Sequence, residues 1–260
     1  MELLDQLPIW VIYLVTVFSI LLTAEIGFRI GIWLQHRSPN LDKIPMSGAV
    51  VGSVLGLMAF LLAFTIGIVI NQHNNRKAMV VIEANAIGTA YLRADFLEET
   101  DRTHSRELLR KYVEQRLSGA SDLAQFDSAM KRSEEIHNHL WEIVAENGRQ
   151  GAESAIFALY VDSINEVIDV HSLRLTAVNL RLPTQLGRML YITTILSFLL
   201  LGVSSSSDGK RNPFAIIIFA IIFVTVFILI VDLDRPQDGL LIVSQDALSD
   251  LLKMMETSSQ

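Results

Sequence analysis

Four long apolar blocks constrain this chain more than any other feature of its sequence. They cover residues 8–34, 48–70, 186–203 and 213–231, and the last three are nearly free of charge. At about 1.5 Å per residue, a helix of each length crosses a hydrocarbon core of about 30 Å. A spanning segment must satisfy its own backbone in lipid, so we expect helices rather than strands. Because a soluble core rarely needs four such helices, the sequence predicts an all-α integral membrane protein with four transmembrane helices.

The stretch between the second and third blocks has a different composition, because it contains most of the charge of the chain. Its apolar residues recur with helical spacing, for example at Leu108, Leu109 and Tyr112, which predicts a helical domain. We expect three or four long helices, the first continuing directly from the second span to about Leu97, and a break at Pro183. Residues 240–255 are typical of a short amphipathic helix that packs on this domain.

These patterns predict the division of the chain. Transmembrane helices 1 and 2 are expected in residues 1–70, a helical cytoplasmic domain in 71–185, transmembrane helices 3 and 4 in 186–233, and a cytoplasmic C-terminal tail in 234–260. Four spans place both termini and the helical domain on one side of the bilayer. The distribution of lysines and arginines near the spans slightly favours a cytoplasmic location of this domain under the positive-inside rule.

Charge and motifs narrow the classes of function. The net charge of -7 gives no support to a nucleic-acid partner, and the lack of cysteine excludes disulfides and thiolate metal sites. The chain has no phosphate-binding loop, dinucleotide fingerprint, nucleophile elbow or zinc-protease motif. His137 and His139 point in different directions on a helix, so we expect surface residues rather than ligands. The sequence therefore predicts no enzymatic activity, no cofactor and no metal site.

The second span carries residues at four-residue spacing that are small at first and bulky afterwards. The series consists of Gly48, Gly52, Gly56, Phe60, Phe64 and Ile68. Positions four apart on a helix drift by about 40°, so the series forms one slowly turning stripe. The glycines allow close helix packing, and the bulky residues would form stacked hydrophobic rings if several copies surrounded an axis. The pattern alone favours a simpler interpretation, in which the stripe packs this helix against the other spans.

The second span leaves the bilayer through the polar run of residues 71–77. In a pore, Asn71, Asn75 and Arg76 would face the ion at the inner mouth, and Arg76 or Lys77 would raise the local concentration of anions. For the cations alone, anchoring at the membrane interface is the favoured interpretation.

Three further groups lie at the spans. Glu25 and Arg29 are four residues apart inside the first span, so we expect a mutually neutralising structural pair rather than a transport site. Residues 232–239 close the fourth span with three carboxylates whose spacing fits no calcium-binding loop, and we expect a structural joint. Residues 204–209 are typical of a turn between the third and fourth spans.

Two segments are distinctive: LLAFTIGIVINQHNNRKAMVVIEANAIGTAYLRADF, which begins in the second span, and DLDRPQDGLL, which follows the fourth. With the helical insert between the second and third spans, they resemble a bacterial family described as bestrophin-like. The resemblance covers nearly the whole chain and is most specific around Glu83 and in residues 232–239. It implies a multi-pass protein of the bacterial inner membrane.

Bestrophins are homopentameric ion channels, mostly anion-conducting, whose second spans line a neck of three bulky apolar residues at four-residue spacing. By position, the resemblance implies that Phe60, Phe64 and Ile68 form this neck. The chain departs from bestrophins after the neck, because Arg76 is followed by Lys77 and Ala78 without the family's aromatic residues. The acidic turn also does not reproduce the calcium-binding clasp of animal members.

The first hypothesis is an oligomeric channel, five-fold and anion-conducting, whose partners are the lipid bilayer, further copies of the chain and the permeating ions. The alternative is a non-conducting membrane scaffold or sensor whose helical domain binds a partner. An intramembrane enzyme is disfavoured, because no acid–base or nucleophile set occurs at membrane depth beyond Glu25 and Arg29.

Overall fold

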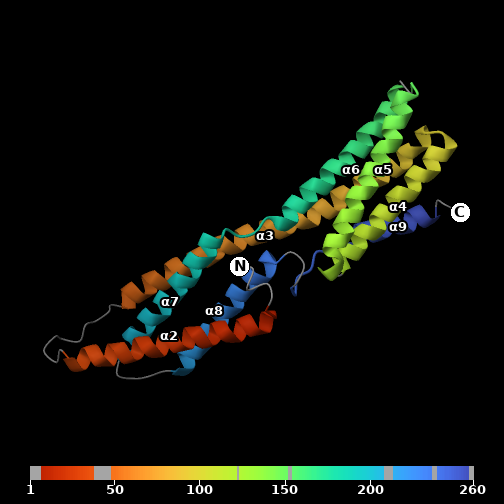
Figure 1. Cartoon of the computed structure of the whole chain (residues 1–260). Coiled ribbons are helices and arrows are strands. Elements are labelled where there is room, and N and C mark those ends of the chain that lie inside the picture. The colour runs from red at the N-terminus through yellow and green to blue at the C-terminus, as the bar shows by residue number, and fades with distance from the viewer. Residues whose placement is uncertain are drawn as a thin grey trace. The chain divides into compact units, whose positions relative to one another are not determined.

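The computed structural model describes residues 7–37, 48–121, 123–151, 154–207, 213–235 and 239–257. Within these ranges every regular element is a helix, which confirms the predicted all-α class (Figure 1). The elements are α2 (Ile9–Arg37), α3 (Gly48–Arg93), η1 (Ala94–Phe96), α4 (Glu99–Ser121), η2 (Leu123–Gln125), α5 (Phe126–Arg149), α6 (Ala155–Asn179), α7 (Thr184–Ser207), α8 (Pro213–Asp234) and α9 (Asp246–Thr257). Four helical stretches are long and apolar enough to cross a membrane, as the four apolar blocks predict.

The chain divides into two compact units. The first unit comprises Met1–Asn71 and Arg181–Leu241, and it contains α2, α7, α8 and the first half of α3. The second unit comprises Gln72–Leu180 and Ile242–Gln260, and it contains the rest of α3 together with α4, α5, α6 and α9. The C-terminal helix therefore belongs to the second unit.

Helix α3 contributes to both units because it continues past the end of its apolar part. It has 46 residues, and at 1.5 Å per residue it is about 70 Å long, more than twice the thickness of a hydrocarbon core. The polar run that starts at Asn71 lies within this helix. The predicted continuation to about Leu97 is confirmed, because α3 ends at Arg93 and η1 at Phe96.

The turn predicted at residues 204–209 is wrong for its first part, because α7 remains helical to Ser207. The Ser205 hydroxyl donates to the Leu201 carbonyl at 2.8 Å, and the Ser206 hydroxyl donates to the Val203 carbonyl at 2.7 Å. Serine can thus stay in an apolar helix by bonding to the preceding turn. Residues 208 and 209 lie outside the described ranges.

Helices α2 and α7 approach each other closely where glycines leave no side chain between them. A Cβ built at Gly202 would overlap the carbonyl oxygen of Ala24, and one at Gly27 would overlap the carbonyl oxygen of Leu199. Membrane helices commonly associate through small residues in this way. Ile20 and Phe198 are fully buried in the core of the same unit.

Replacing Gly202 with alanine is expected to lower the free energy of unfolding by about 1–3 kcal/mol, the usual cost of overpacking. The new methyl group meets backbone, which cannot rotate away as a side chain can. Thermal unfolding in detergent micelles measures the effect. Gly187→Ala on the same helix is the control, because a Cβ there has no neighbour within 4 Å. Equal stability of the two variants would contradict the close contact.

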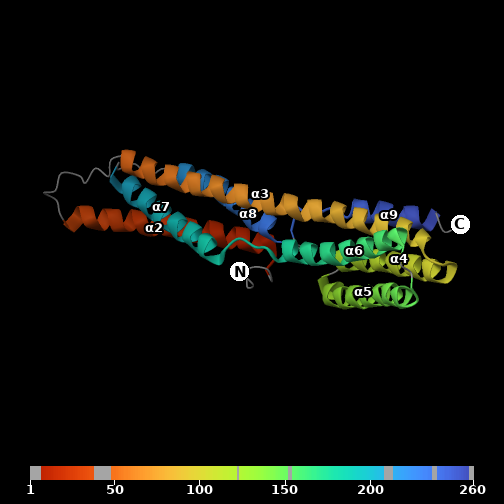
Figure 2. The same cartoon turned by 90° about the horizontal axis from the view of Figure 1, so that it is seen from above.

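The core of the second unit is apolar and draws on all of its helices. Tyr112, Leu140 and Ile164 are fully buried, and so are Leu248 and Met255 of α9. The prediction that the C-terminal helix packs on the helical insert is therefore confirmed. Helices α4 and α5 run side by side in both views (Figures 1 and 2).

Candidate functional site

The first half of α3 has one face buried in the first unit. Met58, Leu62 and Val69 on this face join the apolar core, and Thr65 between them is fully buried. The spacing of three, four and seven residues keeps these side chains on one side of the helix. The stripe of glycines and phenylalanines lies two residues out of register with them. Since each residue turns a helix by about 100°, Phe60 points roughly 200° away from Met58 and Leu62.

The opposite face of α3 is open in the single chain. Phe60 is 66% exposed and Phe64 is 57% exposed, whereas Ile68 is half-buried. A Cβ built at Gly48, Gly52 or Gly56 would have no neighbour within 4 Å in the described part of the chain. The interpretation that the stripe packs α3 against the other spans therefore does not describe Phe60 and Phe64 in the protomer. Close packing at the three glycines stays a prediction, and it would have to involve a helix from outside the protomer.

The polar end of this face is lined by amides. Asn71 and Asn75 are exposed and follow Phe64 by seven and eleven residues, which places them within about 20° of it around the helix. Lys77 is also exposed, but it lies about 140° from Phe64. The exposed stripe therefore continues into uncharged amide groups rather than into cations.

Arg76 occupies a different environment from the expected pore mouth. Its side chain is only 3% exposed, and its Nε and Nη2 donate to the carbonyl oxygens of Ala177 at 3.2 Å and Leu180 at 2.7 Å. These are carbonyls at the C-terminal end of α6, which lack partners within the helix. The guanidinium group thus caps α6.

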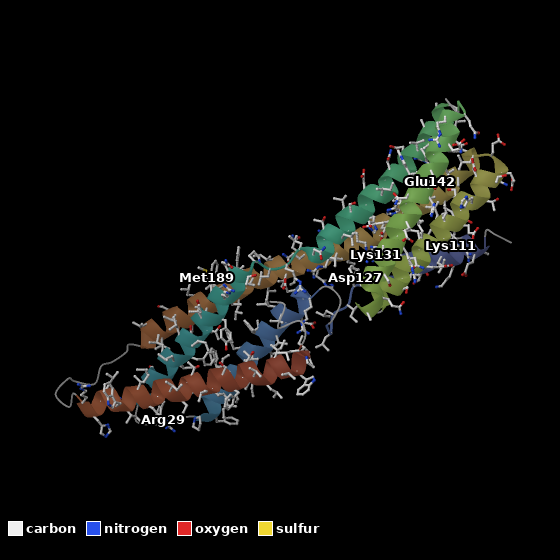
Figure 3. The ribbon with its side chains drawn as sticks, viewed as in Figure 1. Arg29, Lys111, Asp127, Lys131, Glu142 and Met189 are labelled. Atoms are coloured by element: carbon white, nitrogen blue, oxygen red, sulfur yellow. The ribbon has the colours of Figure 1, made fainter. Side chains whose placement is uncertain are left out.

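Glu25 and Arg29 form an ion pair along α2. The Arg29 Nε donates to Glu25 Oε1 at 3.0 Å, and Arg29 lies on the outer side of α2 (Figure 3). The two charges neutralise each other, which lowers the cost of placing either one in a spanning helix.

The carboxylates at the end of α8 bind backbone amides. Asp232 accepts hydrogen bonds from the amides of Leu240 at 2.8 Å and Leu241 at 3.1 Å, and Asp234 accepts one from Leu182 at 2.6 Å. These bonds fasten the segments that enter α7 and leave α8, as expected for a structural joint. Residues 236–238 of the acidic turn lie outside the described ranges. Among the described residues, no three or more His, Asp or Glu side chains are grouped to hold a metal ion.

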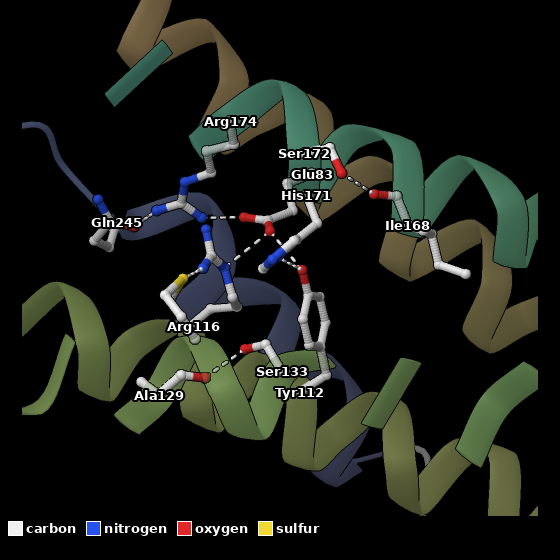
Figure 4. A network of polar contacts seen from close by, with 11 residues as sticks. Glu83, Tyr112, Arg116, Ala129, Ser133, Ile168, His171, Ser172, Arg174 and Gln245 are labelled. Atoms are coloured by element: carbon white, nitrogen blue, oxygen red, sulfur yellow. Dashed lines mark hydrogen bonds and ion pairs between the residues drawn. The ribbon is translucent and has the colours of Figure 1, made fainter. Parts of the chain in front are cut away.

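A fully buried carboxylate forms the centre of the second unit (Figure 4). Glu83 on α3 pairs with Arg174 on α6 and with Arg116 on α4, whose Nε lies 2.9 Å from Glu83 Oε1. The Tyr112 hydroxyl lies 2.8 Å from the same oxygen and 2.9 Å from His171 Nδ1. We call these five side chains the Glu83 cluster. It joins three helices in the interior of the unit.

The electrostatics of the Glu83 cluster favour a structural role. Burial raises the pKa of the Glu83 carboxyl, but Arg116 and Arg174 outweigh burial and hold this pKa below its usual range. Burial and then the Glu83 charge raise the pKa of Tyr112 well above its usual value, so the phenol keeps its proton and donates it to Glu83. No atom of Glu83 is exposed. The cluster therefore holds α3, α4 and α6 together, and its buried carboxylate is not accessible to a substrate.

His137 lies beside this cluster, so the expectation that it is a surface residue is wrong. Its ring centroid is 4.8 Å from that of Tyr112 and 4.9 Å from that of His171, and the side chain is buried. Burial, and then the neighbouring His171, lowers the pKa of His137 to about 4. Burial, and then Arg116, lowers the pKa of His171 to about 4. His139, two residues from His137, is exposed as expected.

The buried imidazoles predict a loss of stability in acid. As the pH falls below about 6.5, the unfolded chain binds protons on both histidines, whereas the folded chain binds them only near pH 4. The two neutral histidines therefore cost no stability above about pH 6.5, and the free energy of unfolding decreases as the pH falls from there toward about 4. We expect the melting temperature to fall between neutral pH and about pH 5, and to fall less in His137→Phe. The exposed control His139→Phe should behave like wild type, and equal losses in all three proteins would contradict the assignment.

The Glu83 cluster is not among the groups predicted from the sequence, although one feature of the sequence indicates it. Glu83 is a single charge in the otherwise uncharged run from Ala78 to Leu92, at helical spacing from the buried residues Val80 and Ile87. A charge on the apolar face of a helix is expected to be paired when buried. Its partners come from α4 and α6, and the sequence alone does not identify them.

Comparison with known proteins supports the resemblance to the bestrophin-like family. A family model described as a bestrophin-like domain matches residues 12–248. The fold is similar to a crystal structure of a singly substituted bacterial bestrophin homologue from Klebsiella pneumoniae, with 14% identity, a TM-score of 0.67 and coverage of 94% of this chain and 99% of that chain. Another crystal structure of a bestrophin homologue from this organism gives 14% identity, a TM-score of 0.66 and coverage of 92% and 95%. No curated protein matches the chain.

Proposed function

This chain belongs to the bestrophin-like family, and from that premise we propose that it forms a homo-oligomeric ion channel, five-fold and anion-conducting. The observation that carries the proposal is the exposed stripe on α3. Phe60 and Phe64 are large apolar side chains that the protomer leaves uncovered on the face opposite its core. Copies of α3 around a shared axis would bring these residues together.

The proposed pore has a hydrophobic neck followed by a polar mouth. Phe60, Phe64 and Ile68 would form successive rings, which exclude water when narrow and conduct when slightly wider. Asn71 and Asn75 would line the mouth, where their amide groups donate hydrogen bonds to a passing anion. Arg76 has no place at this mouth, because it caps α6.

The proposed channel lies in the bacterial inner membrane, with residues 71–185 and both termini in the cytoplasm. We propose that the first unit spans the bilayer and that the second unit surrounds the inner end of the pore. Residues 186–233 would complete the spanning part, and residues 234–260 would return to the helical domain. The role is transport rather than catalysis.

Two measurements test the proposal. Native mass spectrometry of the purified protein in detergent should give a closed oligomer of at least three copies, because one or two helices do not enclose a pore. Liposomes that contain the protein should release chloride faster than empty liposomes. An oligomer without chloride or cation flux, across varied voltage, pH and calcium, would contradict the conduction proposal.

A non-conducting scaffold or sensor is the second candidate. The second unit exposes large apolar side chains, namely Trp141, Ile156 and Leu173, and this candidate assigns them to contacts with a partner. A monomer or dimer in native mass spectrometry would favour this candidate.

A further inference from the structure

The first unit contains an apolar cavity of about 480 Å³ between α2, α7 and α8. Its lining includes Val15 and Thr16 of α2, Ile192 of α7 and Phe227 of α8. Its volume lies in the range of about 300–1,000 Å³ that is usual for sites of small ligands. Val15 is 60% exposed and Ile192 is 57% exposed, so the cavity opens on the outer surface of the spanning helices.

The cavity is amphipathic along its length. Three of its polar lining residues, Thr184 and Arg188 at the start of α7 and Asp234 at the end of α8, lie where these helices leave the apolar region. Val15, Ile192 and Phe227 lie farther inside the spans. Such a gradient matches a molecule with a polar head at the interface and an acyl chain in the hydrocarbon.

The polar end has an excess of positive charge. Asp234 is neutralised by Arg181, whose Nη1 lies 3.6 Å from its carboxylate, and it also accepts the Leu182 amide. Arg188 is exposed and makes no ion pair or hydrogen bond with any residue that the structure describes. The Arg188 guanidinium group is therefore available to bind an anion at this end.

A second polar group points to a ligand inside the cavity. Thr16 is only 6% exposed, it lines the cavity, and its hydroxyl makes no hydrogen bond within the described part of the chain. A threonine in a helix commonly bonds to the preceding turn, but this hydroxyl does not. A partner for this hydroxyl from outside the chain, such as an ester oxygen of a lipid, would satisfy it.

We propose that this cavity binds an anionic membrane phospholipid. The phosphate would lie at Arg188 and Thr184, and one acyl chain would run past Val15, Ile192 and Phe227. Basic pockets between spanning helices bind anionic headgroups, and each arginine near an anionic lipid contributes about 1 kcal/mol, or roughly a fivefold preference.

Native mass spectrometry of the delipidated protein, titrated with dioleoylphosphatidylglycerol or dioleoylphosphatidylcholine, tests the proposal. Wild type should bind the anionic lipid about fivefold more tightly. Arg188→Gln should abolish this preference, whereas the exposed control Arg37→Gln at the end of α2 should retain it. Gly187→Leu should reduce binding of both lipids, because Gly187 lines the cavity with open space at its Cβ position.

Several results would overturn the proposal. Wild type without a preference between the two lipids would exclude a specific anionic site, and an unchanged preference in Arg188→Gln would place the headgroup elsewhere. Complete displacement of phosphatidylglycerol by an equal concentration of oleate would assign the site to a fatty-acid carboxylate. If Gly187→Leu changed the oligomeric mass and left lipid binding unchanged, a second copy of the chain would be the occupant.

Discussion

Replacing Phe64 with alanine is expected to increase chloride efflux from liposomes about tenfold, which corresponds to 1.4 kcal/mol of barrier. The reason is that a ring of alanines leaves a wider and more easily wetted constriction than a ring of phenylalanines. Phe64 is 57% exposed in the protomer, so truncation removes little packing within the chain. Efflux is measured with a chloride-sensitive dye at matched ratios of protein to lipid.

Phe18→Ala on α2 is the matched control, because Phe18 is a similarly exposed phenylalanine of a spanning helix outside the stripe. It should leave the efflux unchanged. An increase of the same size in both variants would indicate a general leak, and no increase in Phe64→Ala would remove this residue from the neck.

Replacing Glu83 with glutamine is expected to lower the free energy of unfolding by about 3–5 kcal/mol, the usual cost of breaking a buried ion pair from one side. Glutamine has nearly the same shape, but it leaves the buried cations Arg116 and Arg174 without a negative charge. Thermal or chemical unfolding in detergent measures the loss.

Glu107→Gln is the control, because Glu107 pairs with Lys111 on the exposed side of α4 and its loss should have no measurable effect. If Glu83→Gln does not fold, Glu83→Gln combined with Arg174→Met should restore part of the stability by removing one unpaired charge. A double variant as unstable as the single one would contradict the charge argument, and so would a fully stable Glu83→Gln.

The spans and the helical class follow from local rules and are therefore predictable. Length and hydropathy define α2, α3, α7 and α8, because no other element satisfies its backbone in lipid. The continuation of α3 past Asn71 also follows from the sequence, which has no proline between Asn71 and Arg93 to end a helix. The break before α7 is predictable as well, because Pro183 cannot continue a helix from α6.

The interior contacts depend on partners that are distant in the chain, and these partners are not encoded locally. Arg174 is 91 residues from Glu83, and the carbonyl that Arg76 binds at Ala177 is 101 residues away. The polar run around Arg76 therefore predicts a pore mouth or an interface anchor, and it does not predict that this side chain binds the end of α6. The burial of His137 is not predictable either, because the sequence does not show that α5 turns this position toward Tyr112. The stripe on α3 is predictable, because it depends only on the spacing of residues within one helix.

The proposed channel requires that Phe64 side chains of neighbouring subunits meet at a shared axis, and cross-linking tests this most directly. The chain contains no cysteine, so Phe64→Cys introduces a single thiol. A short bifunctional thiol reagent, applied to membranes, should link Phe64→Cys subunits into covalent pairs while the control Phe18→Cys stays monomeric. Phe64→Cys subunits that stay monomeric, in a protein that native mass spectrometry shows to be oligomeric, would place Phe64 away from any axis and contradict the channel.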